Sequence, residues 1–228
     1  MFKSLTSATL ALLLLTASAA AAGTAEDAAK QGVKLTDATA VYHELLTSPD
    51  RGVPKELLDN CKCVAVLPGV LKAAIGYGAR HGSGVLICRT ASGWSSPAFV
   101  NISGGSVGFQ LGAESTDLVL FFMTDRSARS LVNGSRITLG GKLSVAAGPF
   151  GRSGEAATNL ELKSEIYSYA RSKGLFAGLS VEGARLAPNA TDITNYYGSG
   201  VTYNQLLFGR GSKNKPAESE TFRKTLPI

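Results

Sequence analysis

Residues 63–123 read CVAVLPGVLKAAIGYGARHGSGVLICRTASGWSSPAFVNISGGSVGFQLGAESTDLVLFFM. Short apolar runs alternate here with glycine and serine and show no helical period, which predicts β-strands. Glycine reaches positive φ without steric cost, so we expect turns at the glycine-rich segments. We expect strands at 64–67, 73–77, 85–89, 94–102, 106–111 and 118–123, and turns at 68–69, 81–84, 92–93 and 103–105. This spacing predicts an antiparallel β-meander that folds into a sandwich or barrel-like core.

The remaining segments predict helices around this core, and hence an α+β fold. Residues 23–52 form an amphipathic helix and a linker, because apolar side chains recur at three- and four-residue spacing up to Leu46. Short peripheral helices are expected to begin at Pro54 and to span 126–132 and 203–208, with a hairpin between them at 165–182. The main domain is therefore predicted at 53–209, followed by a polar, disordered tail at 210–228.

Residues 1–22 have the pattern of a secretory signal peptide. Lys3 supplies a positive start, Leu10 to Leu15 an apolar run, and Ala20 to Ala22 a small-residue cleavage site. An uncleaved membrane anchor is the alternative, but the apolar run is shorter than the ~20 residues of a spanning helix. We therefore expect an exported protein that is periplasmic or secreted and at most peripheral to the membrane.

The charge of the chain argues against nucleic acid as a partner and allows binding to anionic surfaces. Without the leader, which carries one lysine and no acid, the chain has 22 basic and 17 acidic residues, a net charge of +5. This excess is mild and is spread along the chain, without the dense basic run of a nucleic-acid-binding protein. It permits attraction to anionic surfaces.

Three cysteines in an exported chain predict one disulfide. Cys61 and Cys63 lie on the same face of a strand, where a bridge between them is awkward, so Cys88 is expected to pair with Cys63 or, as the less favoured choice, with Cys61. A zinc site needs four ligands, and the chain has only His43 and His81 to add to the cysteines, so we expect no metal.

No motif predicts a catalytic residue. Residues 104–108 match the G-x-S-x-G pattern around Ser106, but a strand-like run follows where a nucleophile elbow needs a helix, and no histidine follows His81. Acid pairs drawn from Glu114, Asp117 and Glu182 leave a hydrolase open as a minor alternative. We expect no enzymatic activity and no cofactor.

A series of separated motifs, in order between about residues 54 and 209, resembles the SYLF domain family. The matching segments are Val64-Ala65-Val66-Leu67-Pro68, Gly84-Val85 to Arg89, Gly93-Trp94-Ser95-Ser96-Pro97-Ala98, Gly108 to Glu114, Thr116-Asp117, Ala147 to Arg152, Tyr167 to Gly178 and Tyr197-Gly198. The resemblance implies a compact α+β domain that binds lipids, with phosphoinositides as ligands of the eukaryotic relatives and export as a property of the bacterial ones. Actin filaments are partners in the yeast branch. Because an exported protein does not meet actin, we expect actin here only by family resemblance.

Candidate contacts to anionic headgroups are basic residues that flank the glycine-rich turns: Lys72, Arg80, Arg89, Arg152, Arg171 and Lys173. Each of them is alternatively a solvated surface charge. A second function, a structural or protein-interaction role at the cell envelope, predicts an exposed aromatic patch formed by Trp94, Phe99 and Tyr167.

Overall fold

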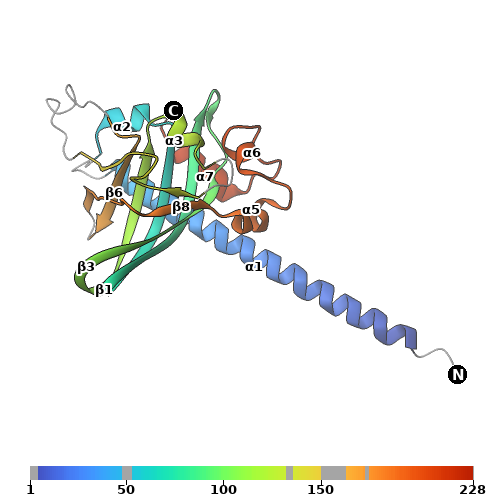
Figure 1. Cartoon of the computed structure of the whole chain (residues 1–228). Coiled ribbons are helices and arrows are strands. Elements are labelled where there is room, and N and C mark those ends of the chain that lie inside the picture. Colours follow the sequence, from blue (N-terminus) through green and yellow to red (C-terminus); the bar gives the residue numbers. More distant parts are fainter. Residues whose placement is uncertain (1–4, 48–52, 132–135, 150–162, 173–174, 228) are drawn as a thin grey trace.

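The computed structural model describes residues 5–47, 53–131, 136–149, 163–172 and 175–227, with side chains from residue 25 onward apart from 74–77, 106–112 and 172. One mixed sheet curls into a half-barrel and is accompanied by a long N-terminal helix and several short helices (Figure 1). The helices are α1 (Leu5–Thr47), α2 (Lys55–Asn60), α3 (Asp125–Arg129), α5 (Ala190–Tyr197), α6 (Tyr203–Leu207) and α7 (Ala217–Thr225). The strands are β1 (Cys63–Thr90), β2 (Gly93–Trp94), β3 (Ala98–Phe122), β4 (Ile137–Thr138), β5 (Val145–Ala147), β6 (Ile166–Ser172), β7 (Leu175–Gly178) and β8 (Arg185–Pro188). The predicted α+β class is confirmed.

Strand order along the main path of the sheet is β2-β1-β3-β6-β5. β7 pairs with β6, and β8 pairs with both β3 and β4. The pairings are antiparallel except that of β5 with β6, which is parallel. The predicted hairpin is confirmed as β6 and β7, and the short helices predicted after Pro54, near 126–132 and at 203–208 are confirmed as α2, α3 and α6.

Two long strands replace the six short strands that the sequence predicts between residues 64 and 123. β1 has 28 residues and β3 has 25, and they pair from Cys63 with Phe122 to Leu86 with Ala98. The turns predicted at 68–69, 81–84 and 103–105 are wrong, because these segments lie inside the strands. Only the predicted turn at 92–93 separates paired strands, since β2 pairs back onto β1 there.

The β1–β3 hairpin is folded back on itself. A straight strand of this length would span about 90 Å, yet the two ends of β1 meet, since the amide of Arg89 donates to the carbonyl of Lys62 at 2.7 Å. The pairing register shifts between Leu67 and Val70, where Gly69 has a φ of 58°. Such a bulge bends a strand and increases its twist. Figure 1 shows β1 and β3 as neighbouring ribbons that curve together at one end of the molecule.

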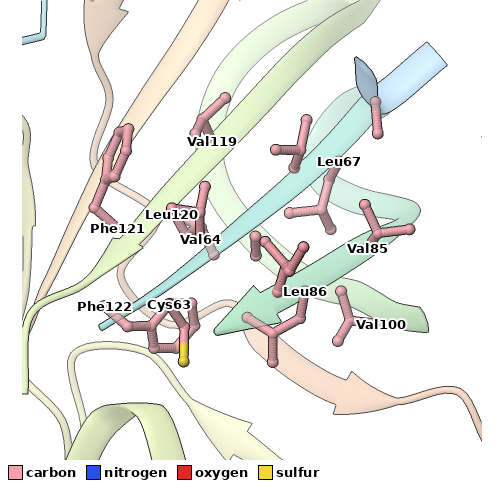
Figure 2. Close-up of a cluster of buried hydrophobic side chains, with 14 of the residues drawn as sticks. Cys63, Val64, Leu67, Val85, Leu86, Val100, Val119, Leu120, Phe121 and Phe122 are labelled. Atoms are coloured by element: carbon pink, nitrogen blue, oxygen red, sulfur yellow. The ribbon is translucent and has the colours of Figure 1, made fainter. Parts of the chain in front are cut away.

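Glycine lets the two halves of the folded hairpin approach closely. A Cβ atom on Gly84 would lie 2.1 Å from the carbonyl oxygen of Val66. Around this contact the core fills with side chains from both halves of β1 and from β3, among them Leu67, Leu86 and Phe121, all fully buried (Figure 2). Gly84, which was predicted to make a turn, therefore serves packing instead.

The disulfide prediction is confirmed as Cys63–Cys88. The two Cα atoms are 3.9 Å apart, because folding of the hairpin brings both ends of β1 together. Cys61 is a buried free thiol that donates to the carbonyl of Leu58 at 3.3 Å.

Helix α1 packs against β1, α5 and α7 through the predicted apolar face, on which Leu35, Ala38 and Tyr42 are fully buried. Lys34 of α1 forms an ion pair of 2.7 Å with Asp192 of α5, and both side chains are largely buried. Within the described ranges, no helix combines the length and the apolar composition needed to cross a membrane.

The C-terminal segment differs from the predicted disordered tail. It contains helix α7, on which Phe222 is fully buried. The indole Nε1 of Trp94 donates to the carbonyl of Pro227 at 2.6 Å, so the end of the chain is held against β2. The sequence prediction failed because the few apolar residues of this segment are spaced for one helical face within a polar background.

Candidate functional site

A partly apolar pocket lies between the two halves of the folded hairpin and β7. Its volume is about 260 Å³. Both halves of β1 contribute to it, since Val70 and Lys72 come from the first half and Arg80 from the second. The other lining residues come from β3, β6 and the β7 segment: Glu114, Thr116, Leu118, Ala170, Leu175, Ala177, Gly178 and Leu179. The pocket exists because the hairpin folds back.

Arg80 is the most informative residue of the pocket. Its side chain is half-buried, and no hydrogen bond or ion pair joins it to any side chain that the structure describes. Burial lowers the pKa of the Arg80 guanidinium, but an arginine is not deprotonated in proteins, so the charge remains. A cation that loses part of its hydration without gaining an anionic partner is unfavourable, and an anionic ligand would compensate it.

Lys72 and Glu114 stand directly opposite each other in the β1–β3 register. Together with Arg80 they give the pocket two positive charges and one negative charge. The net charge at this end of the apolar pocket is therefore positive, which favours an anionic ligand over a cationic one.

Apolar side chains are exposed at the same place. Among the described residues, four large apolar side chains are exposed: Val33, Leu71, Leu175 and Leu179. Leu175 and Leu179, which are 60% and 37% exposed, line the pocket. The combination of an arginine that no described side chain pairs with and protruding leucines suits a ligand that has an anionic group next to a hydrocarbon part.

Arg89 does not reach this pocket and holds the fold together instead. Its Nε donates to the carbonyl of Cys61 at 3.1 Å, and its Nη2 donates to the carbonyl of Leu58 at 3.0 Å. The guanidinium also stacks 4.5 Å from the ring centre of Trp94. These three contacts use the cation within the protein, so the structure does not bring Arg89 to the pocket as the predicted headgroup contact.

Arg171 also differs from its predicted role. It forms ion pairs with Glu44 of α1 and with Asp117 of β3, and only 26% of its side chain is exposed. The carboxylates already neutralise this cation. The remaining two predicted contacts, Arg152 and Lys173, lie outside the described residues. Of the predicted contacts that the structure describes, only Lys72 and Arg80 lie together in the pocket.

The structure also places the residues on which the two alternative functions were predicted. Ser106 lies within β3 and pairs with Gly78 of β1, whereas a nucleophile elbow needs a helix after its strand. Trp94, Phe99 and Tyr167 are 4%, 1% and 7% exposed, so the predicted aromatic surface patch is wrong.

Sequence reasoning missed Leu175 and Leu179 as site residues. Both follow the segment Tyr167–Ser172 in an apolar run that reads as a strand, and a strand residue gives no sign of which face is exposed. A usable signal was the place of this segment directly after β6 in the chain. β7 pairs with β6 alone among the strands described, so it is an edge strand.

Comparison with known proteins places the fold in a family. Residues 103–227 match the family model Ysc84, described as Las17-binding protein actin regulator. This match includes most of β3, the strands β4 to β8 and the C-terminal helix α7.

Full-length relatives extend the likeness toward the N-terminus. SH3 domain-containing YSC84-like protein 1 of Bos taurus is 36% identical over 179 residues, which are 78% of this chain and 52% of that protein. Protein YSC84 of Saccharomyces cerevisiae is 38% identical over 164 residues, or 71% of this chain and 35% of that protein. LAS seventeen-binding protein 3 of the same yeast is 37% identical over 177 residues, which are 76% of this chain and 38% of that protein. The chain thus spans about half the length of the bovine protein and less of the yeast ones, and it belongs to the Ysc84 family, whose domain is also called SYLF.

Proposed function

We propose that this protein is a non-enzymatic module that binds anionic lipid headgroups at the surface of a membrane. The observation that carries the proposal is Arg80, a half-buried cation without a carboxylate partner among the described side chains, in a pocket next to exposed leucines. A phospholipid satisfies both parts of this site, because its anionic phosphate suits Arg80 and its hydrocarbon part suits the leucines.

Electrostatic attraction and apolar insertion contribute comparable free energies in this proposal. Each basic residue near an anionic surface contributes about 1 kcal/mol. Full burial of a leucine side chain contributes about 1.5–3 kcal/mol, of which Leu175 and Leu179 realise the exposed part. Binding should therefore weaken as salt screens the charges, without being lost completely.

Vesicle flotation tests the proposal. Wild-type protein should float with vesicles that contain phosphatidylglycerol, and a smaller fraction of it should float with phosphatidylcholine alone. Arg80→Gln should reduce the bound fraction, whereas Arg185→Gln, which removes an exposed arginine from β8, should leave it unchanged. Failure of the wild-type protein to float with anionic vesicles at low salt would refute the proposal.

The leucines need their own comparison. The double variant Leu175→Ser/Leu179→Ser should lose the salt-resistant part of the binding. Val33→Ser is the matched control, because Val33 is 61% exposed on α1 and does not line the pocket. Equal losses in both variants would show that the leucines have no special role.

We place this activity in the periplasm or outside the cell, because residues 1–22 have the composition of a cleaved leader. Fractionation of a bacterial host that expresses the full chain, with mass analysis of the product, tests this placement. The expected product begins after Ala22 and appears in the exported fraction.

A protein ligand is the second candidate, and family membership favours it. The family description names Las17 binding and actin regulation, and those words belong to the relatives. Co-sedimentation of this protein with actin filaments tests that function. Co-sedimentation above the level of a control protein of similar charge would support this function, and its absence would count against it.

A further inference from the structure

A second pocket, polar and basic, lies where the C-terminal segment covers the β2 turn. Its volume is about 170 Å³. One wall comes from residues 90–96 and the other from residues 206–223. These two walls are more than a hundred residues apart in the chain, so only the folded C-terminal segment creates the pocket.

Three cations line this pocket and one acid accompanies them. They are Arg210, Lys215 and Arg223, with Glu220 as the acid. Glu220 is engaged by Arg223, whose Nη2 lies 2.8 Å from its carboxylate. Neither Arg210 nor Lys215 makes a hydrogen bond or an ion pair with any residue for which the structure gives a side chain, so the pocket has an excess of two positive charges.

Arg223 carries an unsatisfied donor at this place. Its Nη1 contacts the carbonyl of Trp94 at 3.5 Å, but its Nε is buried and finds no acceptor among the described residues. Buried donors in native proteins nearly always have an acceptor, so the described residues satisfy the guanidinium of Arg223, which lines this pocket, incompletely.

Contacts that do not involve Arg210 or Lys215 hold the two walls of the pocket together. The amide of Gly211, at a φ of 73°, donates to the carbonyl of Gln205 at 2.8 Å. A Cβ on Gly211 would lie 2.7 Å from Oγ of Ser96, so the C-terminal loop and the β2 turn are in tight contact. Removal of the charges therefore leaves the pocket itself standing.

We propose that this second pocket binds a phosphate group, either free or at the end of a larger molecule. A phosphate monoester carries about −1.5 to −2 charges at neutral pH and three acceptor oxygens, which matches the excess of two charges and the arginine donors. The pocket has room for one such group, and its polar lining excludes the hydrocarbon part of a lipid. The proposal does not depend on lipid binding at Arg80.

Titration with inorganic phosphate, followed by NMR of the amides of residues 90–96 and 209–223, tests the site. Wild-type protein should bind saturably. The double variant Arg210→Gln/Lys215→Gln should bind about tenfold more weakly or worse, since two charged partners are lost. The control Lys213→Gln/Lys224→Gln removes the same charge from exposed positions of the same segment and should keep the wild-type affinity.

Either of two results overturns the proposal. The first is equal phosphate affinity of the wild type and the Arg210/Lys215 variant, and the second is no saturable binding of phosphate by the wild type. A competition arm identifies the source of the group. If phosphate displaces the protein from vesicles of phosphatidic acid but not from those of phosphatidylglycerol, the pocket takes a lipid monoester. If phosphate binds and displaces neither, the pocket takes a soluble phosphate compound. Both results support the site.

Discussion

The guanidinium of Arg171 on β6 lies 3.3 Å from the carboxylate of Asp117 on β3. The same guanidinium also pairs with Glu44 of α1. One cation therefore ties the N-terminal helix to two strands of the sheet, which gives Arg171 a role in folding.

Replacement of Arg171 by glutamate should destabilise the protein by about 1–3 kcal/mol. The change removes two ion pairs and places a third carboxylate beside Asp117 and Glu44. The lower end of the range applies if solvent screens the pairs strongly, because Glu44 is 48% exposed. Urea unfolding measures the difference. Arg185→Glu, at an exposed position of β8, is the control and should change stability by less than about 0.5 kcal/mol.

Loss of the Cys63–Cys88 disulfide should cost about 3 kcal/mol. The bond closes a loop with a sequence separation of 25, and the constraint on the unfolded chain grows with that separation. The double variant Cys63→Ala/Cys88→Ala and the reduced wild-type protein should both unfold at lower urea concentration than the oxidised protein. Mass mapping that found Cys88 as a free thiol in the oxidised protein would contradict the pairing.

Cys61 should make stability fall at alkaline pH. Burial raises the pKa of its thiol from 9.0 to about 11, although nearby Arg89 opposes the shift. The thiol is protonated in both states below about pH 9, so its contribution is complete there and is lost as the pH rises toward 11. The loss should be on the order of 2–3 kcal/mol.

The buried tyrosines add to this loss, because burial also raises the pKa of residues such as Tyr42. Cys61→Ala separates the two effects. Its stability should fall less steeply than that of the wild type between pH 9 and 11, as measured by urea unfolding. Parallel curves would show that Cys61 does not titrate differently in the two states.

Gly84→Ala should be strongly destabilising, by at least about 2 kcal/mol. The added Cβ would lie 2.1 Å from the carbonyl of Val66 and 2.6 Å from Cα of Leu67, and backbone atoms cannot move aside as a flexible side chain does. Gly105→Ala is the matched control in the other long strand, because its nearest neighbour is 3.7 Å away. Thermal unfolding of the two variants should differ by several degrees. Similar melting temperatures would mean that the halves of the hairpin are not in contact at Gly84.

Much of the fold is readable from the sequence, as the apolar runs near Val64, Val85 and Leu118 do lie in strands and Cys88 does pair with Cys63. The strand lengths are not readable. Glycine favours turns locally, but Gly84 is needed where two backbones touch, and that contact depends on how the hairpin folds back. Local propensity contains no information about such a contact.

The candidate site was predicted only in part for a related reason. A basic residue beside a glycine-rich segment has the same sequence signature whether it lines a pocket, as Arg80 does, or satisfies backbone carbonyls, as Arg89 does. Tertiary structure decides between these roles. Of the leucines that complete the pocket, Leu175 lies in β7 and Leu179 directly follows it, and β7 pairs with β6 alone among the described strands.

Photo-crosslinking to lipid tests the central claim most directly, since it locates the ligand and does not merely detect binding. Vesicles carry a phosphatidylglycerol analogue with a photoreactive group near the headgroup, and the crosslinked peptides are mapped by mass spectrometry. We predict crosslinks to the peptides that contain Val70–Arg80 and Leu175–Leu179, and their loss in Arg80→Gln. Crosslinks confined to other surfaces of the protein, or unchanged by Arg80→Gln, would contradict the account.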